Sequence, residues 1–306
     1  MLRDIASTDA DLVIRACLGA ISGPDGPTDE QLTILRSLAT HLWGLRDVDL
    51  SAGAALTAEE VGARITDPQI SRRTRELMVV LELCRHPLEE AHQQRVEAYC
   101  TAMGEDGPGL ALVRTYVAQG AEAATDDMVR RFDPVAEEMM EPAMIEIAAS
   151  EDTEAARRLA EIDAALKAAG PGTLGAEFLA FYERNGFTVG PESITLFAHD
   201  MAHVIGGYDA TGIGEICIGA MKLMITDSDI HWLELLANLL IHETGLVPAG
   251  YTPSEPALVD PANVDLMVRA MERGRETVTD FSVGDHLSMV DWPYQDVLEH
   301  FGVPPL

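Results

Sequence analysis

The chain has 306 residues, 47% hydrophobic and 5% aromatic, a length that favours two domains and an Ala- and Leu-rich composition that favours packed helices over sheets. Its 51 acidic and 21 basic side chains give a formal net charge of -30 at pH 7. Such a charge repels phosphate backbones and anionic membrane surfaces, so nucleic acid is excluded as an expected partner and any membrane contact is expected to be peripheral.

The cysteines and the amino terminus bear on the cellular compartment. Cys17, Cys84, Cys100 and Cys217 are scattered singly, without CxxC or disulfide-like spacing, which is typical of a reducing compartment. The first six residues lack the apolar stretch of a signal peptide, and no run approaches the roughly 18 residues of a membrane span. We therefore expect a cytoplasmic, all-α protein.

Residues 1–135 are expected to form an N-terminal acidic helical domain. This region contains a weak internal sequence repeat at an offset of 60 residues. Residues 27–30 (Pro-Thr-Asp-Glu) and 87–90 (Pro-Leu-Glu-Glu) each place a proline ahead of acidic residues. Both patterns suit the positive end of a helix dipole, and Gly44 and Gly104 follow at the ends of the two predicted helices. A duplicated helical hairpin would explain this repeat.

An acidic turn ahead of a long amphipathic helix makes this N-terminal region similar to TerB-type helical domains. The resemblance implies that Asp25, Asp29 and Glu30 are ion ligands. The alternative is that these acids only cap and solvate the first turn of a helix, where negative charge is favoured.

The pattern from residue 110 to about residue 169 is strongly helical. A charged run at 151–154 begins a helix that the Gly-Pro-Gly sequence at 170–172 ends. We place the domain boundary within 133–171 and assign residues 136–306 to a second helical domain.

The second domain contains a histidine pair in an apolar segment. His199 and His203 are four residues apart, about 40° around a helix, and Asp200 falls within the same roughly 100° arc. A bare carboxylate among the apolar residues of 194–205 would suffer a desolvation cost unless a positive charge paired with it. Two imidazoles and a carboxylate suit Zn, Fe, Mn or Co.

A fourth candidate ligand follows on the next predicted helix. Gly206 and Gly207 end the first helix, and Glu215 is the only early charge of the next one. An antiparallel return of that helix would bring Glu215 towards His203, so that ligands from two helices converge. The alternative is a pair of hydrogen-bonded core histidines with an ordinary first-turn acid.

The motif His-Asp-x-x-His, followed by eleven residues and Glu, occurs here as His199, Asp200, His203 and Glu215 and resembles the signature of the Coq4 family of quinone-biosynthesis proteins. Similar flanks extend the resemblance over roughly residues 170–306. They include the Gly-Thr-Leu-Gly element at 172–175, the Gly-Glu pair Gly214-Glu215, Lys222 and the Trp-Pro pair Trp292-Pro293.

The resemblance implies a helical protein with a divalent metal held by these four ligands. Zn is the first choice, with Fe, Mn, Co or Mg as alternatives. The metal would lie beside a pocket for a prenylated aromatic molecule, and the family acts in decarboxylating and hydroxylating a quinone-precursor ring. Apolar residues at 194–197 replace charged residues usual in the family, which puts its substrate headgroup contacts in doubt.

A polar stripe follows in the predicted helix 230–244, where His231, Glu234, Asn238 and His242 recur at helical spacing among leucines. The simplest interpretation is a solvent-facing side. The functional interpretation assigns Glu234 and His242 as catalytic residues that move protons or support the metal ligands.

Several large apolar side chains of this half are expected to be plain core, with a pliable tunnel for an isoprenoid tail as the alternative. They are Met201, Met221, Met224 and Trp232.

The leading hypothesis is a metal-dependent enzyme that acts on a hydrophobic, isoprenoid-bearing ring compound, with a homodimer as one oligomeric state open to it. One rival is a non-catalytic isoprenoid-lipid-binding scaffold with a structural metal, which saturated ligation would favour. A second rival is an enzyme on isoprenoid diphosphates. It ranks lower because Asp126-Asp127 is not followed by the aspartate of a DDxxD magnesium motif.

Overall fold

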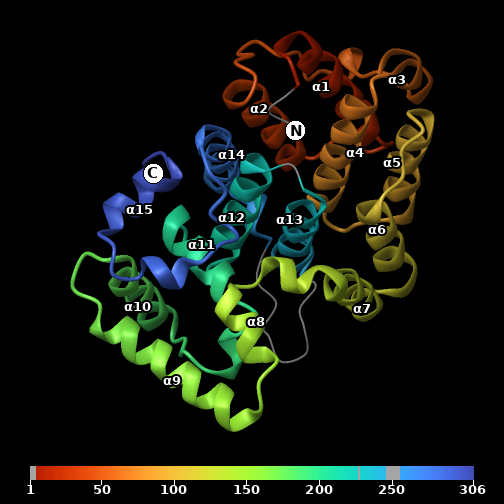
Figure 1. The fold of residues 1–306 in the computed structure, drawn as a ribbon. Coiled ribbons are helices and arrows are strands. Elements are labelled where there is room, and N and C mark those ends of the chain that lie inside the picture. Colours follow the sequence, from red (N-terminus) through yellow and green to blue (C-terminus); the bar gives the residue numbers. More distant parts are fainter. Residues whose placement is uncertain (1–4, 227, 246–255) are drawn as a thin grey trace.

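The computed structural model describes residues 5–226, 228–245 and 256–306 (Figure 1). In these residues it has fifteen α-helices and no strand, so the prediction of an all-α fold is confirmed. The first seven helices are α1 (Ser7–Ile21), α2 (Asp29–His41), α3 (Ala58–Arg64), α4 (Pro68–Leu83), α5 (Glu90–Ala102), α6 (Pro108–Gln119) and α7 (Ala121–Phe132).

The remaining helices begin after a 3-10 segment at Asp133–Met139. They are α8 (Pro142–Ala148), α9 (Asp152–Ala168), α10 (Leu174–Asn185), α11 (Phe197–Gly206), α12 (Gly212–Ile225), α13 (Asp229–His242), α14 (Pro261–Glu276) and α15 (Tyr294–Phe301). No helix of the described ranges combines the length and the apolar character that crossing a membrane requires.

Helices α1 to α5 gather at one end of the molecule and α8 to α10 at the other, with α11 to α14 between them (Figure 1). Helix α12 packs on both α13 and α14, while α14 also packs on α2 and α13 on α4, α6 and α7. The apolar residues of α12 are buried in this centre, which explains why its sequence is hydrophobic on almost every side.

Several helix boundaries agree with the sequence patterns. Helix α2 begins at Asp29 and α5 at Glu90, as the two proline-acid patterns predict. Gly44 and Gly104 both adopt a left-handed φ, 69° and 75°, just beyond the two helices. The duplicated hairpin itself stays a prediction.

Contacts cross the predicted boundary between residues 135 and 136. The Ser37 hydroxyl donates a hydrogen bond to Asp265 at 2.7 Å, and the Arg275 guanidinium donates one to the Leu42 carbonyl at 2.6 Å. These bonds hold α14 against the end of α2. The division into two domains stays a prediction.

Side-chain caps fix where the helices around the histidine pair begin. The hydroxyl of Thr211 accepts from the backbone N–H of Gly214 at 3.2 Å and so caps α12, and Ser228 caps α13 in the same way. These bonds satisfy N–H groups that have no partner within the helix. Gly207, with φ 78°, ends α11 in the left-handed conformation and turns the chain towards α12.

The crossing of α12 and α14 generates a stability prediction, because Gly274 of α14 lies against the backbone of α12. A Cβ atom at Gly274 would lie 2.2 Å from the carbonyl oxygen of Met221, which no change of rotamer relieves. We expect Gly274→Ala to lower the free energy of unfolding by about 2 kcal/mol, since overpacking outweighs the gain in helix propensity. Urea unfolding measures the change.

Gly53→Ala is the matched control, because the nearest atom to a Cβ there, Ser51 Oγ, lies 3.8 Å away. Its effect should stay within about 0.5 kcal/mol. Equal effects of the two substitutions would show that α12 and α14 do not approach as closely as described.

Candidate metal centre

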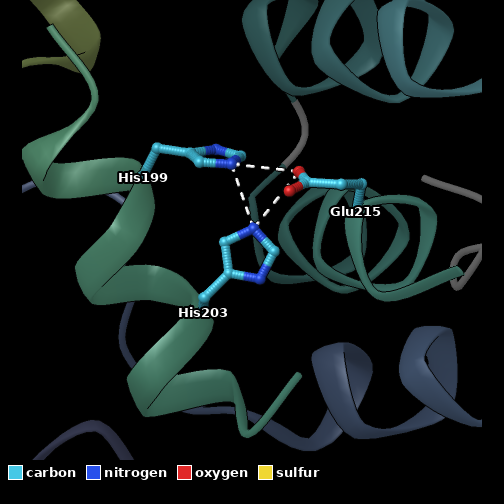
Figure 2. A group of neighbouring side chains, drawn as sticks. All are labelled: His199, His203 and Glu215. Atoms are coloured by element: carbon cyan, nitrogen blue, oxygen red, sulfur yellow. Dashed lines mark hydrogen bonds and ion pairs between the residues drawn. The ribbon is translucent and has the colours of Figure 1, made fainter. Parts of the chain in front are cut away.

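His199 and His203 lie one turn apart on α11, and Glu215 of α12 points at both (Figure 2). The turn after Gly207 folds α12 back against α11, and this brings the first turn of α12 beside the two imidazoles. The predicted return of the second helix towards His203 is therefore present in the structure.

Three donor atoms form a nearly equilateral triangle. His203 Nε2 lies 3.0 Å from His199 Nε2, while Glu215 Oε2 lies 3.1 Å from His199 Nε2 and 3.2 Å from His203 Nε2. Metal bonds to histidine nitrogen and carboxylate oxygen are about 2.0–2.2 Å long, so one ion can reach all three atoms. The residues present therefore fit a divalent metal of the Zn or Fe type.

The far nitrogen of each ring is already engaged. His203 Nδ1 donates to the Tyr208 carbonyl at 2.9 Å, and His199 Nδ1 donates to Glu234 Oε1 at 3.0 Å. Because each Nδ1 holds a hydrogen, each neutral ring presents the lone pair of Nε2 to the triangle. Two lone pairs and a carboxylate oxygen then face one another, and only a shared proton or a metal ion makes that arrangement favourable.

Glu234 also binds a buried lysine. Lys222 Nζ lies 2.6 Å from Glu234 Oε1, and the two side chains are only 1% and 5% exposed. Burial alone would raise the pKa of Glu234, but the Lys222 charge and the hydrogen bonds from His199 and His231 hold it well below its usual range. The ionised Glu234 accepts the hydrogen of His199 Nδ1 and so keeps the His199 ring in one orientation.

The polar stripe of α13 does not face solvent, so the simplest interpretation of it was wrong. His231, Glu234 and Asn238 are buried, and Asn238 Nδ2 donates to the carbonyl oxygen of Glu215 at 2.6 Å. The stripe faces α12 because Lys222 and the backbone of that helix supply polar partners within an otherwise apolar surface.

The structure does not bring Asp200 to the three-donor group. Its Oδ2 accepts a hydrogen bond from the Tyr182 hydroxyl at 2.6 Å, within the buried aromatic cluster of α10 and α11. Burial raises the pKa of Asp200, although the Tyr182 hydrogen bond and the two histidines oppose the shift. Its role as a fourth ligand stays a prediction.

His242 lies at the end of α13, half-buried, with its ring against Gly212 at the start of α12. Burial lowers its pKa, and the nearby charge of Glu215 only partly offsets the shift. The neutral imidazole that results can accept a proton at neutral pH.

The sequence analysis did not identify Tyr182 as the partner of Asp200, or Lys222 as the partner of Glu234. Tyr182 lies on a different helix, eighteen positions before Asp200. Lys222 had a signal, because it follows Glu215 by seven residues, two turns of helix, and so shares its face.

The apolar candidates Met201, Met221, Met224 and Trp232 are all at most 2% exposed and belong to the core, as the simpler interpretation predicts. A cavity of about 150 Å³ lies next to His203. Its lining includes Tyr208 and the ion pair between Arg184 and Asp209. It is smaller than the roughly 300 Å³ of a usual ligand pocket.

The acidic pair of the diphosphate hypothesis has no ligand geometry. Asp127 instead pairs with Arg130 at 3.3 Å and with Arg131 at 2.9 Å, both on the same helix. Such pairs are typical of a solvated helix face.

Comparison with known proteins leaves the family open. No family model matches the chain, and no curated protein matches it. A solved structure, of a candidate ubiquinone biosynthesis protein from Nostoc punctiforme PCC 73102, matches 76% of this chain and 99% of its own length with 17% identity and a TM-score of 0.35. A likeness this weak carries no inference about activity.

The metal-free centre should show a specific pH dependence of stability. Burial disfavours the His199 imidazolium, but hydrogen bonds to Glu215 and Glu234 outweigh it and raise the pKa to about 10. This stabilisation is complete below the unfolded pKa of about 6.5 and is lost as the pH rises through 10. We expect metal-free protein to lose on the order of 2–3 kcal/mol more of its unfolding free energy than His199→Gln between pH 7 and 10.

Urea unfolding across this pH range measures the difference. Saturating Zn²⁺ should abolish it, since the metal replaces the proton on His199. Parallel pH profiles for the two metal-free proteins would contradict the hydrogen-bonded imidazolium.

Proposed function

We propose that this chain is a metal-dependent enzyme that acts on a hydrophobic, isoprenoid-bearing ring compound, with the decarboxylating and hydroxylating chemistry of the Coq4 family. The observation that carries the proposal is the triangle of His199 Nε2, His203 Nε2 and Glu215 Oε2. The engaged Nδ1 atoms of both rings support it, because they leave the metal-binding atoms free. The quinone-type substrate rests on the sequence motif alone.

Three protein ligands favour catalysis over a structural ion. Structural zinc sites are closed by four protein ligands, whereas catalytic sites keep a position open. Asp200, the fourth candidate, is hydrogen-bonded to Tyr182, and this supports an open centre. The side chains of His199 and Glu215 are 20% and 19% exposed, so a substrate can approach from their side.

A bound divalent ion would polarise a carboxylate or phenolate oxygen of the substrate, or activate water or oxygen. Around it the protein would supply position and proton transfer. Glu234 and Lys222 act as positioning residues that hold the His199 ring. His242 is the candidate catalytic residue, because its ring lies near Glu215 and has no hydrogen-bond partner within the part of the chain that the structure describes.

Removing one histidine tests metal binding and turnover together. We expect His203→Ala to lower metal content from one ion at this centre to a trace, and to lower CO₂ release from a prenylated hydroxybenzoic acid under air by about 100-fold or more. Plasma mass spectrometry of untagged protein measures the metal, and trapping of labelled CO₂ measures turnover.

His300→Ala is the control, because His300 is exposed on α15 and is not part of the three-donor group. It should retain metal and turnover. Metal bound in full by the parent protein, no turnover on any prenylated ring acid, and unfolding on chelation would instead identify a structural ion in a lipid-binding scaffold.

A further inference from the structure

A second group of metal-ligating side chains lies where the N-terminal helices meet the end of α13. Glu30 comes from the first turn of α2, His86 from the turn between α4 and α5, and Glu243 directly follows α13. One ligand atom of each lies within 4.8 Å of the others. None of these residues belongs to the first centre or to its Coq4-like motif.

The three side chains of this group differ in their hydrogen bonds and in their burial. His86 Nε2 lies 2.7 Å from Glu243 Oε1, and the other oxygen, Oε2, accepts from the backbone N–H of Leu258 at 2.8 Å. The Glu243 side chain is fully buried, whereas the His86 side chain is 29% exposed. Glu30 Oε1 is inaccessible to solvent and has no hydrogen-bond partner among the described residues.

The charges in this group are not balanced by protein cations. Among the described residues, no Lys or Arg forms an ion pair with Glu30 or Glu243. Burial first, and then the facing Glu243 carboxylate, raise the pKa of Glu30 to about 8. Burial, and then the charges of Glu243 and Glu30, raise the pKa of the nearby Cys84 thiol well above its usual range. Two carboxylates this close need a shared proton or a cation.

We infer that Glu30, His86 and Glu243 bind a second divalent cation, of the Zn²⁺ type. A histidine nitrogen among carboxylate oxygens suits Zn²⁺ better than Ca²⁺ or Mg²⁺, which take oxygen ligands. The partly exposed His86 gives the ion a route of entry. The ion would link three segments that are distant in sequence and hold the end of α13 next to His242.

Counting bound Zn²⁺ tests this site separately from the first. Calorimetric titration of metal-stripped full-length protein should give two ions per chain. Glu215→Gln should lose one ion, and Glu30→Gln should lose the other. The double variant should bind none, and Zn²⁺ should raise the melting temperature of Glu215→Gln but not of the double variant.

Matched variants keep the outcome independent of folding. Asp29 is an exposed acid on the same first turn that the structure does not group with these three residues, so Asp29→Asn should still bind two ions, with affinities within about twofold. His86→Asn should weaken binding of the ion that depends on Glu30 by at least on the order of tenfold. Circular dichroism checks that each variant folds.

Two results would overturn the inference: one ion in the parent protein that Glu215→Gln abolishes, or two ions in both Glu30→Gln and His86→Asn. In either case Glu30 and Glu243 share a proton instead. If the parent protein binds only the ion that depends on Glu30, and none that depends on Glu215, the proposed function is contradicted and the second site is supported.

Discussion

The meeting of two imidazole nitrogens with one carboxylate oxygen, in the interior between α11 and α12, is the constraint on which the rest of this region depends. It requires a sharp turn, which Gly207 provides in the left-handed conformation, and a capped start to α12, which Thr211 provides. It also requires acceptors behind both rings. The Tyr208 carbonyl comes from the same turn, so one local structure both reverses the chain and orients His203.

The second acceptor, Glu234, explains why a lysine is buried in the centre of the molecule. An ionised carboxylate that is only 4% exposed is costly unless a positive charge pairs with it, and Lys222 supplies that charge from the neighbouring helix. His231 extends the network towards Asp280, whose carboxylate lies 3.2 Å from its Nε2. The polar side of α13 is therefore the support of the candidate centre, although it is surrounded by leucines on every other side.

The sequence predicted the helices and three members of the centre because both depend on local spacing. A separation of four residues places His199 and His203 on one face, and a short glycine turn brings back Glu215. The same spacing could not show that Asp200 bonds to Tyr182, because an arc of roughly 100° does not specify a rotamer and Tyr182 comes from another helix. The polar stripe of α13 was interpreted as a solvent face for a related reason. The sequence of α12 is mostly apolar, so it did not indicate that Lys222 would bind Glu234 or that the carbonyl of Glu215 would accept a hydrogen bond from Asn238.

Helix α13 connects the two clusters of metal-ligating side chains, and this relates the N-terminal helices to the candidate centre. Glu234, near the middle of α13, orients His199, whereas Glu243, directly after the end of the helix, lies close to Glu30 and His86. Nine residues of helix separate the two acids by about 13 Å, a rigid spacing that neither cluster can change alone. The TerB-type resemblance implies an ion ligand at Glu30, but no sequence pattern could join it to His86, 56 positions later, or to Glu243, a further 157 positions along the chain. His242 is the last residue of α13 and Glu243 follows it directly, so the second cluster lies next to the candidate proton-transfer group in the chain.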